Sequence, residues 1–325
     1  MSAMTMTSEQ AVEILRAAGE PTRLRILALL ASEELSVLEL CRILDQSQPR
    51  VSRHLKLLAE AGLVERFPDG AWVFYRLAAD APGRELVGQV LADIDPADAT
   101  TRRDAERLSA IHAERSTEAA TYFARNAARW DEIRSFHVAE DKVEKAILAA
   151  AGGERVDRLV DLGTGTGRML SLLSGKAQRR LGLDLSQQML NIARAHTADA
   201  GLDAELRHGD IFATRLPDGC ADLVTVHQVL HYLSDPAAAV AEAARLVAPG
   251  GKLLIVDFAP HTLEVLREQH QHRRLGFSDD EILRWLAAAG LQGEVRETLP
   301  PSNGEGLTVK IWTGVRAAAS KRSAA

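Results

Sequence analysis

The stretch VDLGTGTGRML, residues 160–170, constrains the fold most, because an apolar run ends there in three alternating glycines and then continues as a helical pattern. A strand, a glycine turn and a helix in this order let a nucleotide approach the backbone closely. A dinucleotide fingerprint would need its third glycine at Arg168, whereas this chain has it at Gly167. A P-loop would need a Gly-Lys-Ser or Gly-Lys-Thr triplet, which does not follow. The loop therefore predicts a nucleotide site of another kind.

Short apolar runs alternate with helical segments from Arg158 onward, which predicts a parallel sheet with right-handed crossovers. The carboxyl ends of such strands share one edge, where open α/β sheets bind their ligands. Asp184 ends the second run and is placed to accept hydrogen bonds from ribose hydroxyls. Asp210 follows the third run and is placed to accept from an adenine amino group, with Ile211 beside it to pack on the ring.

The ordered set of glycine loop, Asp184, Gly209-Asp210 and the PGG turn at residues 249–251 resembles the class I S-adenosylmethionine (SAM)-dependent methyltransferases. The resemblance runs from about Tyr122 to the end of the chain, where YFARNAARWDEI is similar to the helix that precedes the core in the small-molecule branch. It implies SAM or S-adenosylhomocysteine (SAH) as the cofactor. The cofactor-binding residues that it implies are Asp161, Gly163, Gly165, Gly167, Asp184, Asp210, Ile211 and His227.

Whether this domain is an enzyme stays open, because methyl transfer from a sulfonium is an in-line displacement. Alignment supplies much of the catalysis of such a step, and a base is optional. His227 and His231 flank the end of the fourth run, facing the expected position of the methyl group, and are the candidate catalytic residues. Their spacing is also that of a zinc protease, but Gln228 replaces the glutamate base. The segment 268–272, with one glutamate and two histidines, is interpreted as a polar helix face, and we expect no metal site.

The chain has two cysteines, Cys41 and Cys220, which lie far apart and lack metal-ligand spacing. They support neither a disulfide framework nor a zinc site, and arsenite methylation, which uses cysteine thiolates, is a poor fit. The first ten residues lack the pattern of a signal peptide, and no later stretch reaches the roughly 20 apolar residues of a membrane span. We therefore expect a cytoplasmic protein without a membrane partner.

The amino-terminal part shows helical spacing in residues 8–30, a short helix capped by Ser36, a helix that begins near Gln48 and a hairpin with its turn at residues 68–70. This order predicts a winged helix-turn-helix. Residues 1–95 carry ten Lys and Arg against fourteen Asp and Glu, so overall charge does not indicate nucleic-acid binding. Residues 46–59, by contrast, hold three Lys or Arg side chains, one histidine and no acid. One short segment is therefore basic within an acidic domain.

These residues resemble the ArsR-type winged helix regulators over about residues 8–94. The resemblance implies that the helix beginning at Gln48 enters the major groove of double-stranded DNA. Ser36 and Leu38 stand where many such proteins carry a metal-sensing cysteine pair, which excludes soft-metal sensing at that site. Symmetric half-sites further imply a homodimer, formed through the first helix and the helix near residues 82–94. The candidate DNA-binding residues are Gln48, Arg50, Ser52, Arg53, His54 and Lys56.

The fold class that we predict is α/β, in four parts. Residues 1–95 form the winged helix-turn-helix domain, and residues 96–150 form a helical connector or lid. Residues 151–317 form a class I, Rossmann-like methyltransferase domain, and residues 318–325 form a disordered tail. The large apolar residues of the connector are Tyr122, Phe123, Trp130, Ile133 and Phe136.

The combination of the two domains is similar to bacterial regulators that control SAM recycling and methionine genes in response to SAH. It implies a DNA-binding regulator whose second domain binds SAM or SAH as an effector. The alternative is an active methyltransferase of an unknown small molecule, with the winged helix regulating its own gene. A nucleic-acid methyltransferase is less well supported, because VHQV stands where a motif of the Asn-Pro-Pro-Tyr type would be expected.

Overall fold

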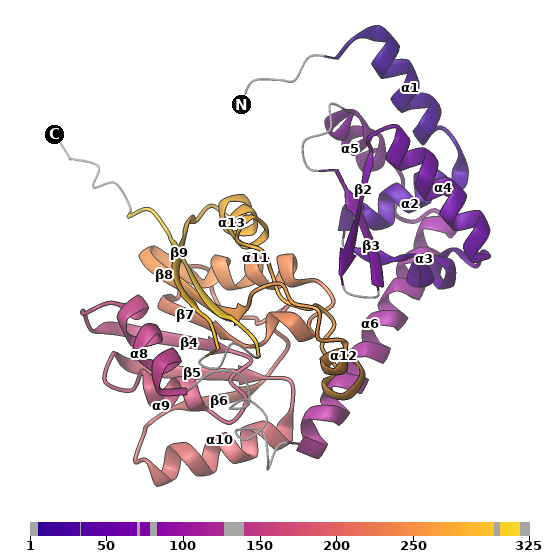
Figure 1. The fold of residues 1–325 in the computed structure, drawn as a ribbon. Coiled ribbons are helices and arrows are strands. Elements are labelled where there is room, and N and C mark those ends of the chain that lie inside the picture. Colours follow the sequence, from indigo (N-terminus) through magenta and orange to yellow (C-terminus); the bar gives the residue numbers. More distant parts are fainter. Residues whose placement is uncertain are drawn as a thin grey trace, which may run out of the picture. The chain divides into compact units, whose positions relative to one another are not determined.

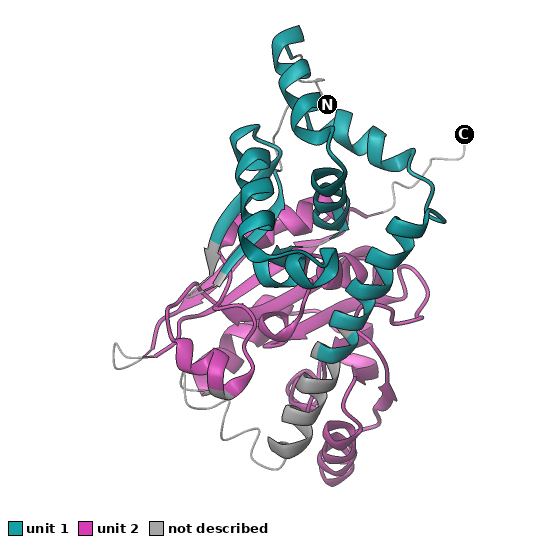
Figure 2. Cartoon of the chain, turned by 90° about the vertical axis from the view of Figure 1, so that its right-hand side faces the viewer, with its two compact units in different colours: residues 1–116 teal, residues 117–325 magenta. Residues whose placement is uncertain are grey.

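The structure is a computed structural model that describes residues 6–32, 34–69, 72–78, 83–126, 140–301 and 306–318. The chain divides into two compact units, Met1–Ser116 and Thr117–Ala325 (Figure 2). The finer four-part division that we derived from the sequence stays a prediction. Trp130, Ile133 and Phe136 of the connector lie outside the described residues, as do the side chains of Tyr122 and Phe123 and the tail beyond residue 318.

Unit 1 is a winged helix-turn-helix, as predicted (Figure 1). A capping box at Thr7 starts the first helix, and a second one at Ser36 starts the short helix before the turn. The three strands pair antiparallel in the order β1-β3-β2. The elements are α1 (Ser8–Ala18), α2 (Pro21–Ser32), β1 (Leu35–Ser36), α3 (Val37–Leu44), α4 (Gln48–Glu60), β2 (Val64–Asp69), β3 (Trp72–Leu77), α5 (Arg84–Ala92) and the first part of α6 (Ala99–Asn126).

Unit 2 contains a seven-stranded sheet in the order β6-β5-β4-β7-β8-β10-β9. The strands from β6 to β8 are parallel, and β10 pairs antiparallel with both β8 and β9. The five apolar runs expected from Arg158 onward, RLVDLG, RLGLDLS, AELRHGD, ADLVTVHQ and KLLIVDF, are all strands of this sheet. The elements are α8 (Glu140–Ala151), β4 (Val156–Leu162), α9 (Arg168–Leu172), β5 (Ala177–Asp184), α10 (Gln187–Asp199), β6 (Glu205–His208), β7 (Ala221–His227), η2 (Leu230–Tyr232), α11 (Pro236–Leu246), β8 (Val247–Phe258), α12 (Glu264–His270), α13 (Asp279–Ala288), β9 (Gln292–Leu299) and β10 (Val309–Val315).

The sheet of unit 2 is buried on both faces, and β8 shows how. Leu253 and Ile255 belong to one apolar cluster, which includes side chains of α11 and α13. Leu254 and Val256 belong to another, which includes side chains of α8 and α9. A strand that is covered on both faces has a continuous run of apolar residues in its sequence, and KLLIVDF of β8 has this pattern. Among the described residues, no helix is both long and apolar enough to cross a bilayer.

Candidate functional site

The glycine loop connects β4 to α9, and its three glycines adopt a backbone that other residues avoid. Gly163, Gly165 and Gly167 have φ angles of 71°, 53° and 83°. These values lie in the left-handed region, which glycine enters without the steric cost of a Cβ atom. A Cβ atom on Gly163 would lie 2.5 Å from Cγ2 of Val229. Each glycine is therefore required by the local backbone, which leaves a compact turn at the carboxyl end of β4.

Asp184 is the last residue of β5 and holds this loop. Its Oδ2 atom accepts a hydrogen bond of 2.8 Å from the backbone N–H of Gly165, and its Oδ1 atom accepts one of 2.8 Å from that of Ser186. Burial raises the pKa of the Asp184 carboxyl above its ordinary value, and the hydrogen bonds from the two backbone N–H groups offset only part of this rise. The sequence predicted Asp184 at the end of its strand, and the structure adds that its carboxylate is hydrogen-bonded directly to the glycine loop.

Asp161 lies within the sheet. It is 1% exposed, and its Oδ1 atom accepts a hydrogen bond of 2.6 Å from the Thr225 hydroxyl. Asp161 and Thr225 are partners in the β4–β7 register. The side chain therefore links strands β4 and β7, just before the glycine loop begins in the sequence.

The segment after β6 brings a second carboxylate to the edge that carries Asp184. The Gly209 N–H donates to the Asp184 carbonyl over 3.0 Å, so the two segments are bonded. Asp210 is exposed and accepts from the Phe212 N–H over 2.9 Å, whereas Ile211 is only 8% exposed and packs in the core. Leu185 is 41% exposed and follows Asp184 directly. Sequence reasoning did not single it out, although a large apolar residue directly after Asp184, the acid predicted to bind ribose, was a visible signal.

The two candidate catalytic histidines lie in different surroundings. His227 ends β7 and is partly exposed. His231 is 1% exposed, and its Nδ1 atom lies 2.7 Å from Oδ1 of Asp257, a residue of β8 with no exposed surface. Of the two histidines expected to face the methyl group, His231 is therefore enclosed, whereas His227 is partly exposed.

Aromatic rings surround His231. The ring centroids of Tyr232 and His272 both lie 4.1 Å from the ring centroid of His231, and that of Phe258 lies 5.1 Å away. His272 follows the end of α12 and is 4% exposed, so the interpretation of this segment as a polar helix face is wrong for His272. Within the described part of the chain, no three His, Cys, Asp or Glu residues form a group suited to a metal ion.

The predicted DNA-binding residues all lie on α4 but do not share one face. Gln48, Arg50, Arg53 and Lys56 are exposed, and Ser52 is half-buried. His54 has a side chain that is only 14% exposed, and its Nδ1 atom lies 3.5 Å from Oε2 of Glu20. His54 therefore lies on the inward flank of α4, because a helix turns by about 100° per residue and the buried positions are Val51, Leu55 and Leu58.

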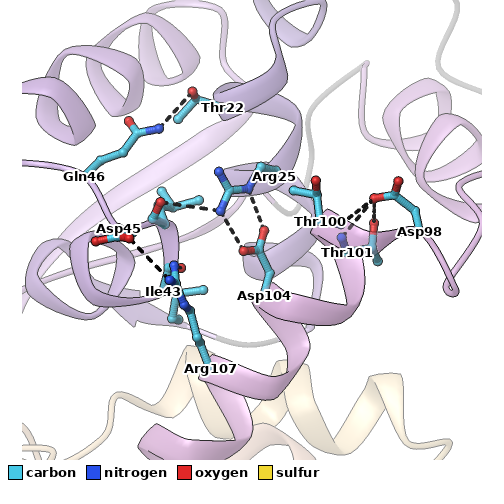
Figure 3. A network of polar contacts seen from close by, with 11 residues as sticks. Thr22, Arg25, Ile43, Asp45, Gln46, Asp98, Thr100, Thr101, Asp104 and Arg107 are labelled. Atoms are coloured by element: carbon cyan, nitrogen blue, oxygen red, sulfur yellow. Dashed lines mark hydrogen bonds and ion pairs between the residues drawn. The ribbon is translucent and has the colours of Figure 1, made fainter.

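Helix α6 is anchored on the helix-turn-helix by a polar network that Figure 3 shows. Arg25 of α2 donates two hydrogen bonds of 2.6 Å to the carboxylate of Asp104, whose side chain is 7% exposed. Arg107 donates to the carbonyl of Ile43 over 2.8 Å and to the carboxylate of Asp45 over 3.3 Å. Asp45 has a φ angle of 57° and caps the end of α3, in the turn that leads to α4. Helix α6 is thus hydrogen-bonded both to α2 and to the turn before α4.

Comparison with known proteins matches one segment of each unit to a family. Residues 20–66 match the bacterial regulatory proteins of the arsR family, and residues 160–255 match a methyltransferase domain. The arsenical resistance operon repressor of Escherichia coli is 46% identical over 72 residues, which are 22% of this chain and 62% of the repressor. An uncharacterized HTH-type transcriptional regulator of Methanocaldococcus jannaschii is 44% identical over 75 residues, 22% of this chain and 82% of that protein.

The second domain has relatives of its own. A ubiquinone biosynthesis O-methyltransferase of Thiobacillus denitrificans is 33% identical over 153 residues, which are 42% of this chain and 65% of that enzyme. The chain spans less than two thirds of the length of this enzyme and of the Escherichia coli repressor. The two matches fall in different units of the chain. The chain therefore belongs to the arsR family of regulators through its winged helix-turn-helix, which is fused to a methyltransferase domain.

Proposed function

We propose that this protein is a transcriptional regulator that binds double-stranded DNA and whose methyltransferase domain binds SAM or SAH as an effector. We further propose that it controls genes of the methionine and SAM cycle. Gln48, Arg50, Ser52, Arg53 and Lys56 of α4 are the DNA-binding residues of this proposal. A recognition helix whose exposed face carries basic and amide side chains suits the major groove.

The groups at the carboxyl edge of unit 2 fit an adenosine-containing ligand. The glycine loop presents backbone without side chains, the carboxylates of Asp184 and Asp210 are hydrogen-bond acceptors, and exposed Leu185 offers an apolar face for a base. The Oγ1 atom of Thr164, inside the loop, is buried and has no hydrogen-bond partner within the described residues. Ribose hydroxyls and the adenine amino group are the donors that such carboxylates would accept from. When bound, SAM would supply an activated methyl group, and SAH would not.

One observation favours a regulator over two independent fused functions: the anchoring of α6. This helix runs without a break from Ala99 to Asn126, across the point at which the two units divide. Its first part is bonded to Asp45, in the turn that precedes the recognition helix. A change in the position of α6 would therefore move the turn from which α4 begins. By linkage, a ligand that favours one such position changes the affinity for DNA, and DNA changes the affinity for the ligand equally.

A homodimer is part of the proposal. Val12 and Leu15 of α1 are 44% and 50% exposed, and Val90 of α5 is 39% exposed. Exposed apolar residues on these two helices suit a two-fold interface that would place two recognition helices about one turn of DNA apart. Light scattering at micromolar concentration is expected to give twice the mass of the chain. A monomeric mass across that range would contradict the dimer.

The experiment that tests the function is fluorescence anisotropy on DNA from upstream of the protein's own gene, with SAM, SAH or neither. We expect one of the two ligands to shift the binding curve. Equal DNA binding in all three conditions would favour the alternative, a methyltransferase acting on a small molecule. The partly exposed His227, at the carboxyl end of β7, is the residue that such an enzyme would have beside its acceptor.

Arg53→Ala is expected to weaken DNA binding by about 1–3 kcal/mol, because a bidentate contact to a base is lost. The affinity for SAH, measured by calorimetry on the same protein, is expected to stay unchanged. Equal loss of both affinities would mean that the two functions are not divided between the units.

A further inference from the structure

A hollow of about 410 Å³ lies in unit 1, between α4 and the strands of the wing. Pockets that hold small molecules have volumes of about 300–1,000 Å³, so this hollow is large enough for one. One side of it is a single stripe of α4, because residues three and four apart share a helix face. The stripe consists of Gln48, Ser52, Leu55, Lys56 and Ala59.

The floor of the hollow is apolar. Leu55 of α4 is fully buried, and Val37 of α3 and Val73 of β3 are half-buried. Tyr75 also lines the hollow and lies on the same face of β3 as Val73, because alternate residues of a strand share a face. The floor therefore offers aliphatic surface and one aromatic ring to a ligand.

The wing strands bring a cation to the rim. Arg66 of β2 lines the hollow and is exposed, and no carboxylate in the described part of the chain forms an ion pair with it. Arg76 differs, because it lies on the opposite face of the sheet, where it pairs with Glu65 at 2.9 Å and Glu34 at 3.4 Å. The guanidinium toward the hollow is thus available to a ligand, while the one on the other face is neutralised.

A second cation, Lys56, borders the hollow from the helix. Its ion pair with Glu60 measures 3.8 Å, and both side chains are mostly exposed. Such exposed pairs within one helix are weak, so another anion can take the place of Glu60. None of the lining residues is acidic. The hollow therefore combines an apolar floor with a rim that carries two cations.

We propose that this hollow binds a small aromatic carboxylate. Its carboxylate lies between Arg66 and Lys56, and its ring system lies on Val73 and Tyr75. A guanidinium can donate two parallel hydrogen bonds to a carboxylate, and a rigid ring system packs on the tyrosine with little loss of conformational freedom. A bare anion such as phosphate would gain nothing from the apolar floor.

A ligand in the hollow is expected to compete with DNA. Gln48, Ser52 and Lys56 line the hollow and are also DNA-binding residues of the proposed function. The bound carboxylate would cover them and neutralise a cation that DNA needs. The competition rests on the proposed function, whereas binding of the carboxylate does not. The hollow would thus give the regulator a second input, which acts on unit 1 directly and not through SAM or SAH.

The first test measures binding of naphthoate to the full-length protein without DNA, by the fluorescence anisotropy of naphthoate itself. We expect a Kd between about 10 µM and 1 mM, which is the range that a ligand of this size reaches in a pocket. Naphthamide lacks the charge and acetate lacks the ring system. In competition with naphthoate, each is expected to bind at least about tenfold more weakly.

Variants locate the site. Arg66→Gln is expected to weaken naphthoate binding about tenfold, because charged hydrogen bonds are lost. Ala59→Phe fills the hollow from an exposed position of α4 and is expected to weaken binding at least as much. Leu57→Phe, at an exposed position of α4 outside the lining, is the matched control. Arg102→Gln removes an exposed cation of α6, and both controls are expected to bind naphthoate as the wild type does.

The second test adds naphthoate to the complex of the protein with DNA. The wild type is expected to release DNA at naphthoate concentrations near the measured Kd. Ala59→Phe is expected to need concentrations at least about tenfold higher, in proportion to its weaker binding of naphthoate.

The outcomes separate the ligand site from the proposed function. No binding of naphthoate, or equal binding by wild type, Arg66→Gln and Ala59→Phe, would overturn the site. Equal affinity for naphthamide would overturn the role of the two cations. A DNA affinity that naphthoate leaves unchanged would overturn the competition alone. A wild-type protein that binds naphthoate as expected but no DNA would overturn the proposed function and support the carboxylate site. Thermal unfolding of each variant checks that unit 1 stays folded.

Discussion

The recognition helix α4 and the glycine loop after β4 meet their proposed ligands with different chemical groups. Helix α4 presents side chains, among them Arg53 and Lys56, on a regular backbone that would form with many other exposed residues. The loop presents backbone, and its conformation exists only because Gly163, Gly165 and Gly167 have no side chains. A side-chain site can therefore change its specificity by substitution without loss of the fold. A site built from backbone cannot change in this way, because a substitution of its glycines would disturb the loop. Its residues are for that reason easier to recognise in a sequence.

The two units also differ in where their important polar side-chain pairs lie. Unit 1 uses Arg25 and Asp104 to attach α6 to α2, and the arginine side chain is 23% exposed. Unit 2 encloses His231 and Asp257 almost completely, with side chains 1% and 0% exposed. Breaking a pair costs more when the remaining partner cannot reach water, because its desolvation is no longer compensated. The comparison predicts unequal effects of mutation in the two units.

The largest effect is expected for His231→Ala. It leaves the Asp257 carboxyl buried without its side-chain partner, which is expected to lower the free energy of unfolding of unit 2 by about 3–5 kcal/mol. Urea unfolding of the full chain, followed by circular dichroism, measures this. His227→Ala is the matched control and is expected to cost less than about 1 kcal/mol, because its side chain is partly exposed. Equal, small costs for both variants would mean that His231 has no structural role.

Asp104→Ala is expected to destabilise unit 1 by about 2–3 kcal/mol, less than the loss in unit 2 because Arg25 retains access to water. Unit 2 is expected to keep its stability and its affinity for SAH. The control on the same helix is Arg102→Ala, whose exposed pair with Glu106 contributes roughly 0.5 kcal/mol or less. If Asp104→Ala lowered the stability of unit 2 by as much as that of unit 1, the treatment of the units as separate would fail.

Asp184→Asn is expected to weaken SAH binding by about 1.5–2 kcal/mol, roughly tenfold to thirtyfold, because hydrogen bonds to a charged acceptor become bonds to a neutral one. The amide keeps the size of the side chain and one acceptor for the loop. Calorimetry on Asp203→Asn, which removes an exposed carboxylate of the same unit, serves as the control and is expected to match the wild type. Unchanged affinity in Asp184→Asn would remove Asp184 from the site.

The smallest effect concerns acid stability. The Arg245 guanidinium, with hydrogen bonds from Thr214, lowers the pKa of Glu242 from 4.5 to about 2. Because the pKa is lower in the folded state, Glu242 stabilises unit 2 fully above pH 4.5, and this contribution disappears as the pH falls toward 2. We expect it to be about 1 kcal/mol, since Arg245 is partly exposed.

Glu242→Gln is expected to flatten the fall in stability of unit 2 across this pH range. Glu294→Gln, which removes the exposed partner of Arg296, is expected to leave the fall as in the wild type. The measurement is urea unfolding at several pH values between about 2 and 6. An identical pH profile in wild type and Glu242→Gln would show that another carboxyl group causes the acid sensitivity.

Features encoded by neighbouring residues were predicted well from the sequence. The glycine loop, the parallel sheet, the helix cap at Ser36 and the winged helix all depend on spacing within about 20 residues, which backbone geometry converts directly into structure. The position of Asp184 belongs to this group as well, because the end of a parallel strand places it at the carboxyl edge of the sheet. Its role in ligand binding stays a prediction.

Features that join distant parts of the chain were not predicted. The partner of Arg25 lies 79 residues away, and the partner of His231, a residue of η2, lies 26 residues away on strand β8. His54 was included among the DNA-binding candidates because its segment is basic, yet its side chain is only 14% exposed and lies next to Glu20 of another segment. Nothing in the spacing of a sequence indicates which of two polar residues will be enclosed, because enclosure depends on the elements that pack around each one.

The sequence by itself determined the two families, the order of the elements and the three glycines, because these follow from local backbone preferences and from the periodic burial of apolar side chains. The tertiary structure alone decided that His231 is buried beside Asp257. It also decided that α6 is hydrogen-bonded to the turn before α4, and that Arg66 lines a hollow beside α4. The physical reason is that charge pairing and burial are properties of surfaces brought together by folding, and a linear pattern specifies each surface without specifying its neighbour.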